Sequence, residues 1–243
     1  ICSRFGSGFT ESPDYADIRL YICTKFAKLQ FCYRGFVQEA DAQNDNVTIQ
    51  ITMTIAPLVK YISNIVDLTD DDIKLLAHYF KPADFSKGSI LEREGKISEK
   101  LYFVTNGFIR SFFYKDGIEV TTQIVGENKF ITSFNSFTSG ITSKENIQCI
   151  SNCEAFFITK SDYENLTSES VFWSIFCRQL YENVIVHNQQ RTIDFIALSA
   201  EKRYLKLLNG QPEIIQYVPI QFIASYIGIK PESLSRIRKK IIS

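Results

Sequence analysis

Between Phe85 and Ile158, apolar residues alternate with polar ones and turn signals recur at short intervals. A period of two is typical of half-buried strands, because successive side chains of a strand point to opposite faces. Five dipeptides that contain glycine mark the turns: Lys87-Gly88, Glu94-Gly95, Asn106-Gly107, Asp116-Gly117 and Gly126-Glu127. The pattern predicts roughly seven or eight short strands in a small antiparallel sandwich or roll.

Two of these turns predict β-hairpins. Asn106-Gly107 separates two apolar runs, residues 101–105 and 108–114, and Asn-Gly suits the primed turns that the twist of paired strands requires. The next hairpin is expected to turn at Asp116-Gly117. Further strands are expected over residues 89–93, 120–125, 146–150 and 155–158.

Helical patterns flank the predicted strands. Residues 57–80 are expected to form two helical pieces, and Thr69 is a good N-cap because aspartates follow it where the helix dipole favours acids. This capping role explains the aspartates without a metal ion. Ser161 is expected to cap a further helix, and residues 171–197 predict one long helix of about 40 Å.

A stripe of residues follows the long helix at alternating steps of four and three. It comprises Trp173, Cys177, Leu180 and Val184, continued by His187, Arg191, Phe195 and Leu198. A seam on so long a helix is typical of pairing with a second copy of the chain, and this interpretation is favoured here. The alternative is that the stripe packs against the β domain of its own chain.

The C-terminal residues 217–243 predict two short helices separated by a turn. The first helix carries Ile220, Ile223, Ala224 and Ile227 on its inner face, and the second carries Leu234, Ile237 and Ile241 on one face. Gly228 permits the left-handed backbone of a sharp stop, and Pro231 restarts a helix at its first position. This is the helix-turn-helix layout, whose second helix enters the DNA major groove.

The exposed face of the second helix predicts base contacts. Glu232 and Arg236 are four residues apart and point the same way, with Ser233 beside them. A guanidinium can bind guanine O6 and N7, and a carboxylate can accept from cytosine N4, each giving about 1–3 kcal/mol of discrimination. The candidate phosphate contacts are Lys230, Arg238, Lys239 and Lys240. The alternative is an ordinary amphipathic helix with a solvated charged face.

The distribution of charge supports a nucleic-acid contact at one end of the chain. The whole sequence of 243 residues has zero formal net charge, yet residues 196–243 hold eight lysines and arginines against three glutamates. A basic segment on an acidic body is typical of a local contact with nucleic acid. Since the sequence shows neither a bilayer-spanning apolar run nor a signal peptide, a cytoplasmic location without a membrane partner is expected.

Residues 1–52 differ from the rest, with no clear amphipathic period. The only methionine is Met53 and the first residue is isoleucine, which supports the hypothesis that Met53 is the initiator and residues 1–52 are not native. A genuine N-terminal extension is the alternative, and an intact mass of the native protein would distinguish the two.

The spacing of cysteines and histidines argues against a metal site. Neither Cys23 with Cys32 nor Cys149 with Cys153 has the two-residue spacing of zinc ribbons, so unmodified thiols are expected. Only His78 and His187 are present, which excludes the histidine-rich metal site of cupin enzymes. Because the chain also lacks a P-loop and the Rossmann glycine pattern, no enzymatic activity and no metal or catalytic residues are expected.

Taken in order, a β roll, a long helix and a terminal helix-turn-helix resemble the Crp/Fnr family of transcription regulators, over residues 53–243. The most specific part is IASYIGIKPESLSRIRK, residues 223–239, in which Glu232 and Arg236 take the family's base-reading positions. Residues 199–208 resemble the helix that opens the DNA-binding domain. The implied fold class is α+β, an antiparallel β-roll or jelly roll followed by a long dimerisation helix and a helix-turn-helix domain.

The resemblance implies three domains and their partners. Residues 53–168 correspond to a cyclic nucleotide-binding-like effector domain, 169–198 to the dimerisation helix and 199–243 to the DNA-binding domain. The protein is then expected to be a homodimer that binds a near-palindromic double-stranded DNA operator and regulates transcription. Activation would require a contact with RNA polymerase, which no residue in the sequence identifies.

The sequence departs from the family at the ligand site. The Gly-Glu-Leu of cyclic-AMP-binding members falls on Thr132-Ser133-Phe134, and their phosphate-binding arginine falls on Ser143-Lys144. Cyclic AMP is therefore not expected as a ligand, and another effector could lie near Ser133, Asn135, Ser143 and Lys144. A ligand-binding module whose C-terminal helices bind a protein partner is the alternative function.

Overall fold

The computed structural model describes residues 55–242, all of which fall within one compact unit. Our hypothesis about residues 1–52 lies outside this range. A helix through residues 55–63 precedes the numbered elements. The strands are β1 (Lys81–Phe85), β2 (Ile90–Glu92), β3 (Lys100–Asn106), β4 (Ile109–Lys115), β5 (Ile118–Val125), β6 (Lys129–Ile131), β7 (Asn146–Cys149) and β8 (Cys153–Thr159). The helices are α3 (Asp70–Tyr79), α4 (Phe134–Ser139), α5 (Lys160–Glu169), α6 (Val171–Ala197), α7 (Ala200–Gly210), α8 (Pro212–Tyr217), α9 (Ile220–Tyr226) and α10 (Pro231–Ile242).

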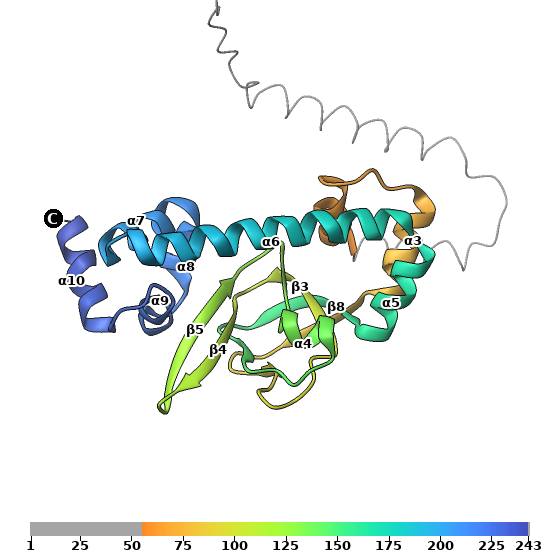
Figure 1. The fold of residues 1–243 in the computed structure, drawn as a ribbon. Coiled ribbons are helices and arrows are strands. Elements are labelled where there is room, and N and C mark those ends of the chain that lie inside the picture. The colour runs from red at the N-terminus through yellow and green to blue at the C-terminus, as the bar shows by residue number, and fades with distance from the viewer. Residues whose placement is uncertain (1–54, 243) are drawn as a thin grey trace, which may run out of the picture. The chain divides into compact units, whose positions relative to one another are not determined.

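The strands form two antiparallel four-stranded sheets, which confirms the predicted roll. One sheet has the order β1-β8-β3-β6 and the other β2-β7-β4-β5 (Figure 1). Side chains between the sheets form a core that includes Val104, Ile109 and Ile147, all fully buried. A second cluster joins the roll to the flanking helices, with Phe103, Trp173 and the other buried aromatic rings at its centre.

The hairpin predicted at Asn106-Gly107 is wrong, because β3 and β4 belong to different sheets. Gly107 adopts φ 91°, and a Cβ there would lie 2.3 Å from the carbonyl oxygen of Asn152. The dipeptide thus forms a tight corner at which the chain leaves one sheet for the other and passes close to the β7–β8 loop. Asn-Gly supplies the left-handed backbone that either kind of turn needs, so its presence does not tell them apart.

The hairpin predicted at Asp116-Gly117 is confirmed. Lys115 pairs with Ile118, and both turn residues have positive φ, 52° for Asp116 and 77° for Gly117. Positive φ at both positions is typical of the primed turn that matches the twist of its strands. Because β5 ends the sheet order, its outer edge is left for another element.

Two predicted caps have different outcomes. Thr69 is the N-cap of α3 and forms a capping box with Asp72, as expected. Ser161 is not the cap of α5, because Thr159 precedes the helix and its hydroxyl accepts from the backbone N–H of Asp162 at 3.1 Å. Both Thr159 and Ser161 are good capping residues, so only the end of strand β8 places the helix start.

The long helix α6 spans Val171–Ala197, as predicted, and lies along the roll in Figure 1. The first part of the predicted stripe faces its own chain, since Trp173, Cys177 and Leu180 are buried in the cluster that joins the roll to its helices. For these residues the alternative, packing within the chain, is therefore correct. The opposite face of α6 exposes a different apolar stripe: Val171, Ile175, Ile185, Ile193 and Ile196.

The helices α7 to α10 form a C-terminal helical unit around their own core. Ile223, Ala224, Ile227 and Leu234 are buried there, as the pattern of the two short helices predicts. Ile124 and Ile150 of the roll belong to the same cluster, so the unit packs against the roll through apolar contacts. No helix among residues 55–242 is long and apolar enough to cross a membrane.

Candidate nucleic-acid interface and effector pocket

The turn between α9 and α10 is held by a glycine that cannot be replaced without strain. Gly228 has φ 75°, and a Cβ there would lie 2.7 Å from Cε1 of Phe195 on α6. The backbone N–H of Ile229 donates to the carbonyl of Ala224 at 2.9 Å, which closes the end of α9. The turn therefore sets the angle between the two helices and brings them against the end of α6.

The three predicted base-reading residues lie on the exposed side of α10. Lys230 precedes the helix, and its carbonyl accepts from the backbone N–H of Ser233 at 3.0 Å. Glu232, Ser233 and Arg236 are exposed, while Leu234 between them is fully buried. The sequence therefore identified the outward-facing positions of this helix correctly, and their role in base reading stays a prediction.

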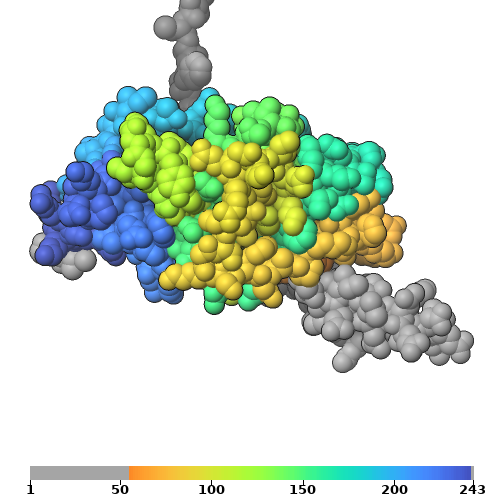
Figure 2. Space-filling model, turned by 90° about the horizontal axis from the view of Figure 1, so that it is seen from below, coloured from red at the N-terminus to blue at the C-terminus, as the bar shows by residue number. Residues whose placement is uncertain are grey.

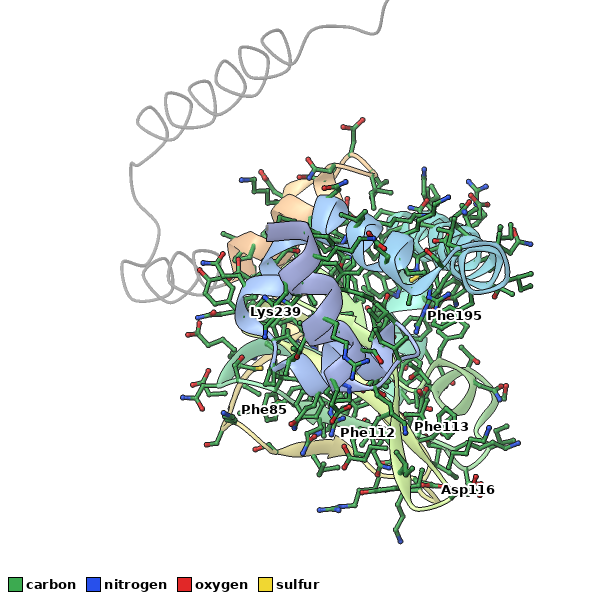
Figure 3. All side chains as sticks on the ribbon, turned by 90° about the vertical axis from the view of Figure 1, so that its left-hand side faces the viewer. Phe85, Phe112, Phe113, Asp116, Phe195 and Lys239 are labelled. Atoms are coloured by element: carbon green, nitrogen blue, oxygen red, sulfur yellow. The ribbon has the colours of Figure 1, made fainter. Side chains whose placement is uncertain are left out.

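The four candidate phosphate contacts divide into two pairs. Lys230 and Lys239 are exposed, and Figure 3 labels Lys239 on the ribbon of α10. Lys240 is exposed as well and pairs with Glu201 of α7, at 3.0 Å, and Arg238 donates to the carbonyl of Ile215 at 3.5 Å. The latter two cations thus help to hold α10 on its neighbours, and any phosphate contact would compete with these bonds.

Two of the four candidate effector residues meet in the structure. The hydroxyl of Ser143 donates to the hydroxyl of Ser133 at 2.8 Å, and both residues are buried. Asn135 and Lys144 are exposed, on the first turn of α4 and beside Ser143 respectively. We call residues 132–145, which connect β6 to β7, the cassette.

Sequence reasoning missed a glutamate, Glu145, at the end of the cassette. The hydroxyl of Thr122 donates to the carboxylate of Glu145 at 3.2 Å, and Ser133 donates to it as well. Burial raises the pKa of Glu145, while these hydroxyl donors oppose the shift. The cassette therefore holds a half-buried acid directly after Ser143-Lys144, the two residues on which the family's phosphate-binding arginine is expected to fall.

Arg110 is the second residue that sequence reasoning missed. It is 2% exposed, and its guanidinium lies over the rings of Phe112 at 4.1 Å and Phe222 at 3.8 Å. It also donates to Gln148 at 2.7 Å and pairs with the carboxylate of Glu119. Since Phe222 belongs to α9, this cation joins strand β4 to the C-terminal helical unit.

The outer edge of β5 makes the second contact with the same helix. The backbone N–H of Thr121 donates to the hydroxyl of Ser225 at 2.9 Å, and this hydroxyl donates to the carbonyl of Glu119 at 3.3 Å. Figure 2 shows the blue C-terminal unit against the yellow-green hairpin of β4 and β5, whose residues Phe112 and Asp116 are labelled in Figure 3. No sequence signal reports such a contact, because its partners are over a hundred residues apart along the chain.

Groups that could hold a metal ion are not found in the described part of the chain. Within residues 55–242, no three histidine, cysteine, aspartate or glutamate side chains gather as metal ligands. The buried thiols of Cys149 and Cys153 lie close enough to form a hydrogen bond, and the thiol of Cys153 also donates to the carbonyl of Phe108 at 3.3 Å.

The fold is similar to that of known proteins. Residues 82–170 match the cyclic nucleotide-binding domain family. The described chain also has the fold of Crp/Fnr transcription regulators, in which such a domain precedes a terminal helical region. A search of curated proteins gives no significant match.

Three solved structures represent this similarity. FixK2 from Bradyrhizobium japonicum superposes with a TM-score of 0.58 at 16% identity, over 67% of this chain and 84% of that one. A putative Crp/Fnr regulator from Eubacterium rectale gives 0.56 at 18% identity, over 72% and 83%. The c-di-GMP responsive regulator CLP from Xanthomonas campestris gives 0.55 at 18% identity, over 70% and 89%. At these identities the similarity concerns the fold.

Proposed function

We propose that the protein is a sequence-specific DNA-binding transcription regulator of the Crp/Fnr type, which acts as a homodimer. The observation that carries this proposal is the exposed polar face of α10, which carries Glu232, Ser233 and Arg236 and faces away from the buried Leu234. A helix whose apolar residues Leu234, Ile237 and Ile241 pack on its neighbours while its other side is exposed can enter a major groove. Arg236 then reads guanine and Glu232 reads cytosine.

Lysines around this face would position the helix on the duplex. Lys230 lies at the N-terminal end of α10 and Lys239 near its C-terminal end, both exposed. Contacts from lysine to phosphate release counterions, so affinity for DNA falls steeply with salt concentration. Such contacts supply affinity without sequence information, which remains with the residues at the first turns of α10.

Dimerisation is supported by the exposed apolar stripe of α6. Ile185, Ile193 and Ile196 are all more than half exposed, although isoleucine is among the most often buried residue types. Burying this face against the same face of a second copy would remove it from water and give a twofold pair. Two recognition helices could then reach half-sites about 34 Å apart.

The residues of the cassette do not favour cyclic AMP as an effector. The carboxylate of Glu145 would repel a cyclic phosphate, and the hydroxyls of Ser133 and Ser143 already bond to each other. A ligand would have to break these bonds and bring a cation or neutral donors to the carboxylate. An effector of this cassette is therefore expected to differ from the cyclic nucleotides.

Selection of bound duplexes from a random DNA pool tests the proposal. The wild-type protein should enrich a near-palindromic site, and Arg236→Ala should reduce the preference for one base pair in each half-site by about 1–3 kcal/mol. Arg93→Ala is the matched control, since Arg93 is an exposed arginine just after β2, away from both α10 and the exposed stripe of α6. It should leave the selected sequence unchanged.

Three results would contradict the proposal. A protein with no preference for any duplex over random competitor at low salt would favour the alternative, in which the C-terminal helices bind a protein partner. Equal selectivity of Arg236→Ala and the wild type would show that α10 does not read the bases through this residue. An asymmetric single half-site would argue against the dimer.

A further inference from the structure

A groove lies between the last turns of α6 and the C-terminal helical unit. Its cavity of about 280 Å³ is lined by residues from α6, α7 and the end of α9. The side chains that matter for its chemistry are His187, Arg191, Asp194 and Phe195 of α6, with Arg203 and Lys206 of α7. Leu198 and Ser199 connect α6 to α7, two of the helices that line the groove.

Positive charge in this groove exceeds negative charge. Arg191, Arg203 and Lys206 line it, against the single carboxylate of Asp194. That carboxylate is bonded to Lys206 at 2.6 Å and accepts from the amide of Gln190 at 2.9 Å. Asp194 therefore neutralises the ammonium group, and the two guanidinium charges have no carboxylate among the residues that line the groove.

Both guanidiniums contact neutral groups. Arg191 donates to the carbonyl of Tyr226 at 3.0 Å and lies over the ring of that residue at 4.1 Å. Arg203 donates to the carbonyls of Ile227 and Leu198 at 3.0 and 2.6 Å. Carbonyl and ring contacts orient a guanidinium but leave its charge in place.

Both guanidiniums also flank one aromatic ring. The ring of Phe195 lies 5.3 Å from the guanidinium carbon of Arg191 and 4.8 Å from that of Arg203. Figure 3, which looks along α6 from its C-terminal end, labels Phe195. Burial lowers the pKa of Arg191, and burial together with this cation lowers the pKa of the neighbouring His187. The two guanidinium charges of Arg191 and Arg203 thus lie beside the same ring.

We propose that this groove binds a small organic anion, whose phosphate or carboxylate group is held by Arg191 and Arg203 and whose body packs on Phe195. Guanidinium groups fit the oxygen atoms of either group with paired hydrogen bonds, and Arg is the residue type suited to such recognition. Leu207 and Ile227 supply the apolar lining that ligand sites combine with a few polar groups.

An anion bound in this groove would affect how α6 and the C-terminal helical unit are arranged. It would contact α6 on one side and α7 on the other, across the connection at Leu198. A bound anion would therefore favour one angle between the long helix and the C-terminal helical unit. The site is separate from the cassette, and its existence does not depend on the proposed DNA binding.

Titration calorimetry with four probes tests the site in the full-length protein. Phenyl phosphate and benzoate carry the two anionic groups on the same ring, benzyl alcohol is the neutral analogue, and inorganic phosphate lacks the ring. We expect saturable binding of phenyl phosphate or benzoate at one site per chain, no binding of benzyl alcohol, and weaker binding of inorganic phosphate. The comparison of the first two probes identifies the preferred anionic group.

Variants assign the binding to the groove. Arg191→Gln should weaken the binding of the preferred probe about tenfold or more, because a charged hydrogen-bond donor is lost. Arg93→Gln, at an exposed arginine just after β2, is its matched control and should leave the affinity within about twofold. Lys206→Gln, at a half-exposed position, provides a second variant that keeps both guanidiniums and should weaken binding about threefold or more. Lys202→Gln, on the exposed side of α7, is the corresponding control.

Three outcomes would overturn the inference. One is the absence of saturable binding by all three anionic probes, and another is binding that Arg191→Gln and Lys206→Gln both leave unchanged. The third is that the groove variants lower the affinity for DNA while the anionic probes do not bind. The cations of the groove would then contact DNA phosphates. Loss of DNA selectivity with intact anion binding would contradict only the proposed function.

Discussion

The cassette and the joint of the C-terminal helical unit bury charge in opposite ways. The joint comprises the contacts of α7 to α10 with α6 and the β4–β5 hairpin. In the cassette the carboxylate of Glu145 accepts from Thr122 and Ser133 hydroxyls. In the joint the guanidiniums of Arg110, Arg191 and Arg203 lie on aromatic rings.

The difference concerns how each region can change. Hydroxyl groups rotate and can satisfy one another, so the cassette is complete without a ligand. An aromatic ring orients a guanidinium but does not neutralise its positive charge. The guanidiniums of the joint can therefore leave their rings and carbonyls and bind an anion. We therefore expect the joint to dominate stability and regulation, and the cassette to respond weakly.

The largest effect should come from the buried cation of the joint. Arg110→Ala removes the partner of Glu119 and the contact with Phe222, which should lower the free energy of unfolding by about 2–3 kcal/mol. Arg93→Ala, at an exposed arginine just after β2, is the control and should change it by less than about 0.5 kcal/mol. Urea denaturation measures both. Equal losses of unfolding free energy in the two variants would show that the contacts of Arg110 in the joint do not stabilise the fold.

The turn at the joint should give the next largest effect. Gly228→Ala forces an alanine to φ 75° and a Cβ to within 2.7 Å of Phe195, so a loss of about 2 kcal/mol is expected. Gly210→Ala is the matched control, because a Cβ at Gly210 meets nothing within 4 Å. Thermal unfolding of the two variants should differ clearly. Similar midpoints would mean that the ring of Phe195 at the end of α6 moves aside at little cost in stability.

The cassette should respond to pH through Glu145. Because burial raises the pKa of this carboxyl on folding, the folded state binds more protons between its ordinary and its raised pKa. Stability contributed by this group is therefore highest at low pH and falls as pH rises through that window. Glu145→Gln should remove this part of the pH dependence and stabilise the protein at pH 7 by less than about 1 kcal/mol.

Urea denaturation across the acid range measures this difference. Glu127→Gln, at an exposed glutamate in the turn after β5, is the control and should follow the wild-type profile. An unchanged slope in Glu145→Gln would show that the hydroxyl donors fully compensate for burial.

The smallest effect should come from the exposed lysine of the cassette. Lys144→Ala should change stability by less than about 0.5 kcal/mol, since Lys144 is exposed beside the buried Ser143. Cyclic AMP at about 1 mM should raise the thermal midpoint of neither the wild type nor this variant. A cyclic-AMP-dependent rise that Lys144→Ala abolishes would restore the lysine as a phosphate ligand.

Several features were predictable because their causes are local. The capping box at Thr69 and the primed turn at Asp116-Gly117 depend on neighbouring residues, and both are confirmed. The same holds for α9 and α10, where the spacing of Ile223, Ala224 and Leu234 decides which face is buried. The outward direction of Glu232 and Arg236 follows from that spacing.

The errors concern choices that local sequence leaves open. Asn106-Gly107 supplies a turn, but whether it joins paired strands or forms a corner depends on which sheet receives the next strand. Along α6, two opposite faces are apolar, and the periodicity cannot say which of them the roll will cover. Both questions are decided by elements far away in the chain.

The sequence by itself determined the elements, their turns and the exposed face of α10, because hydrophobic period, capping and glycine conformation act within a few residues. Only the tertiary structure decided that Arg110 joins the roll to α9, that Glu145 occupies the cassette, and that Arg191 and Arg203 share the ring of Phe195. Burial and charge pairing depend on which distant surfaces meet, and no local pattern records that.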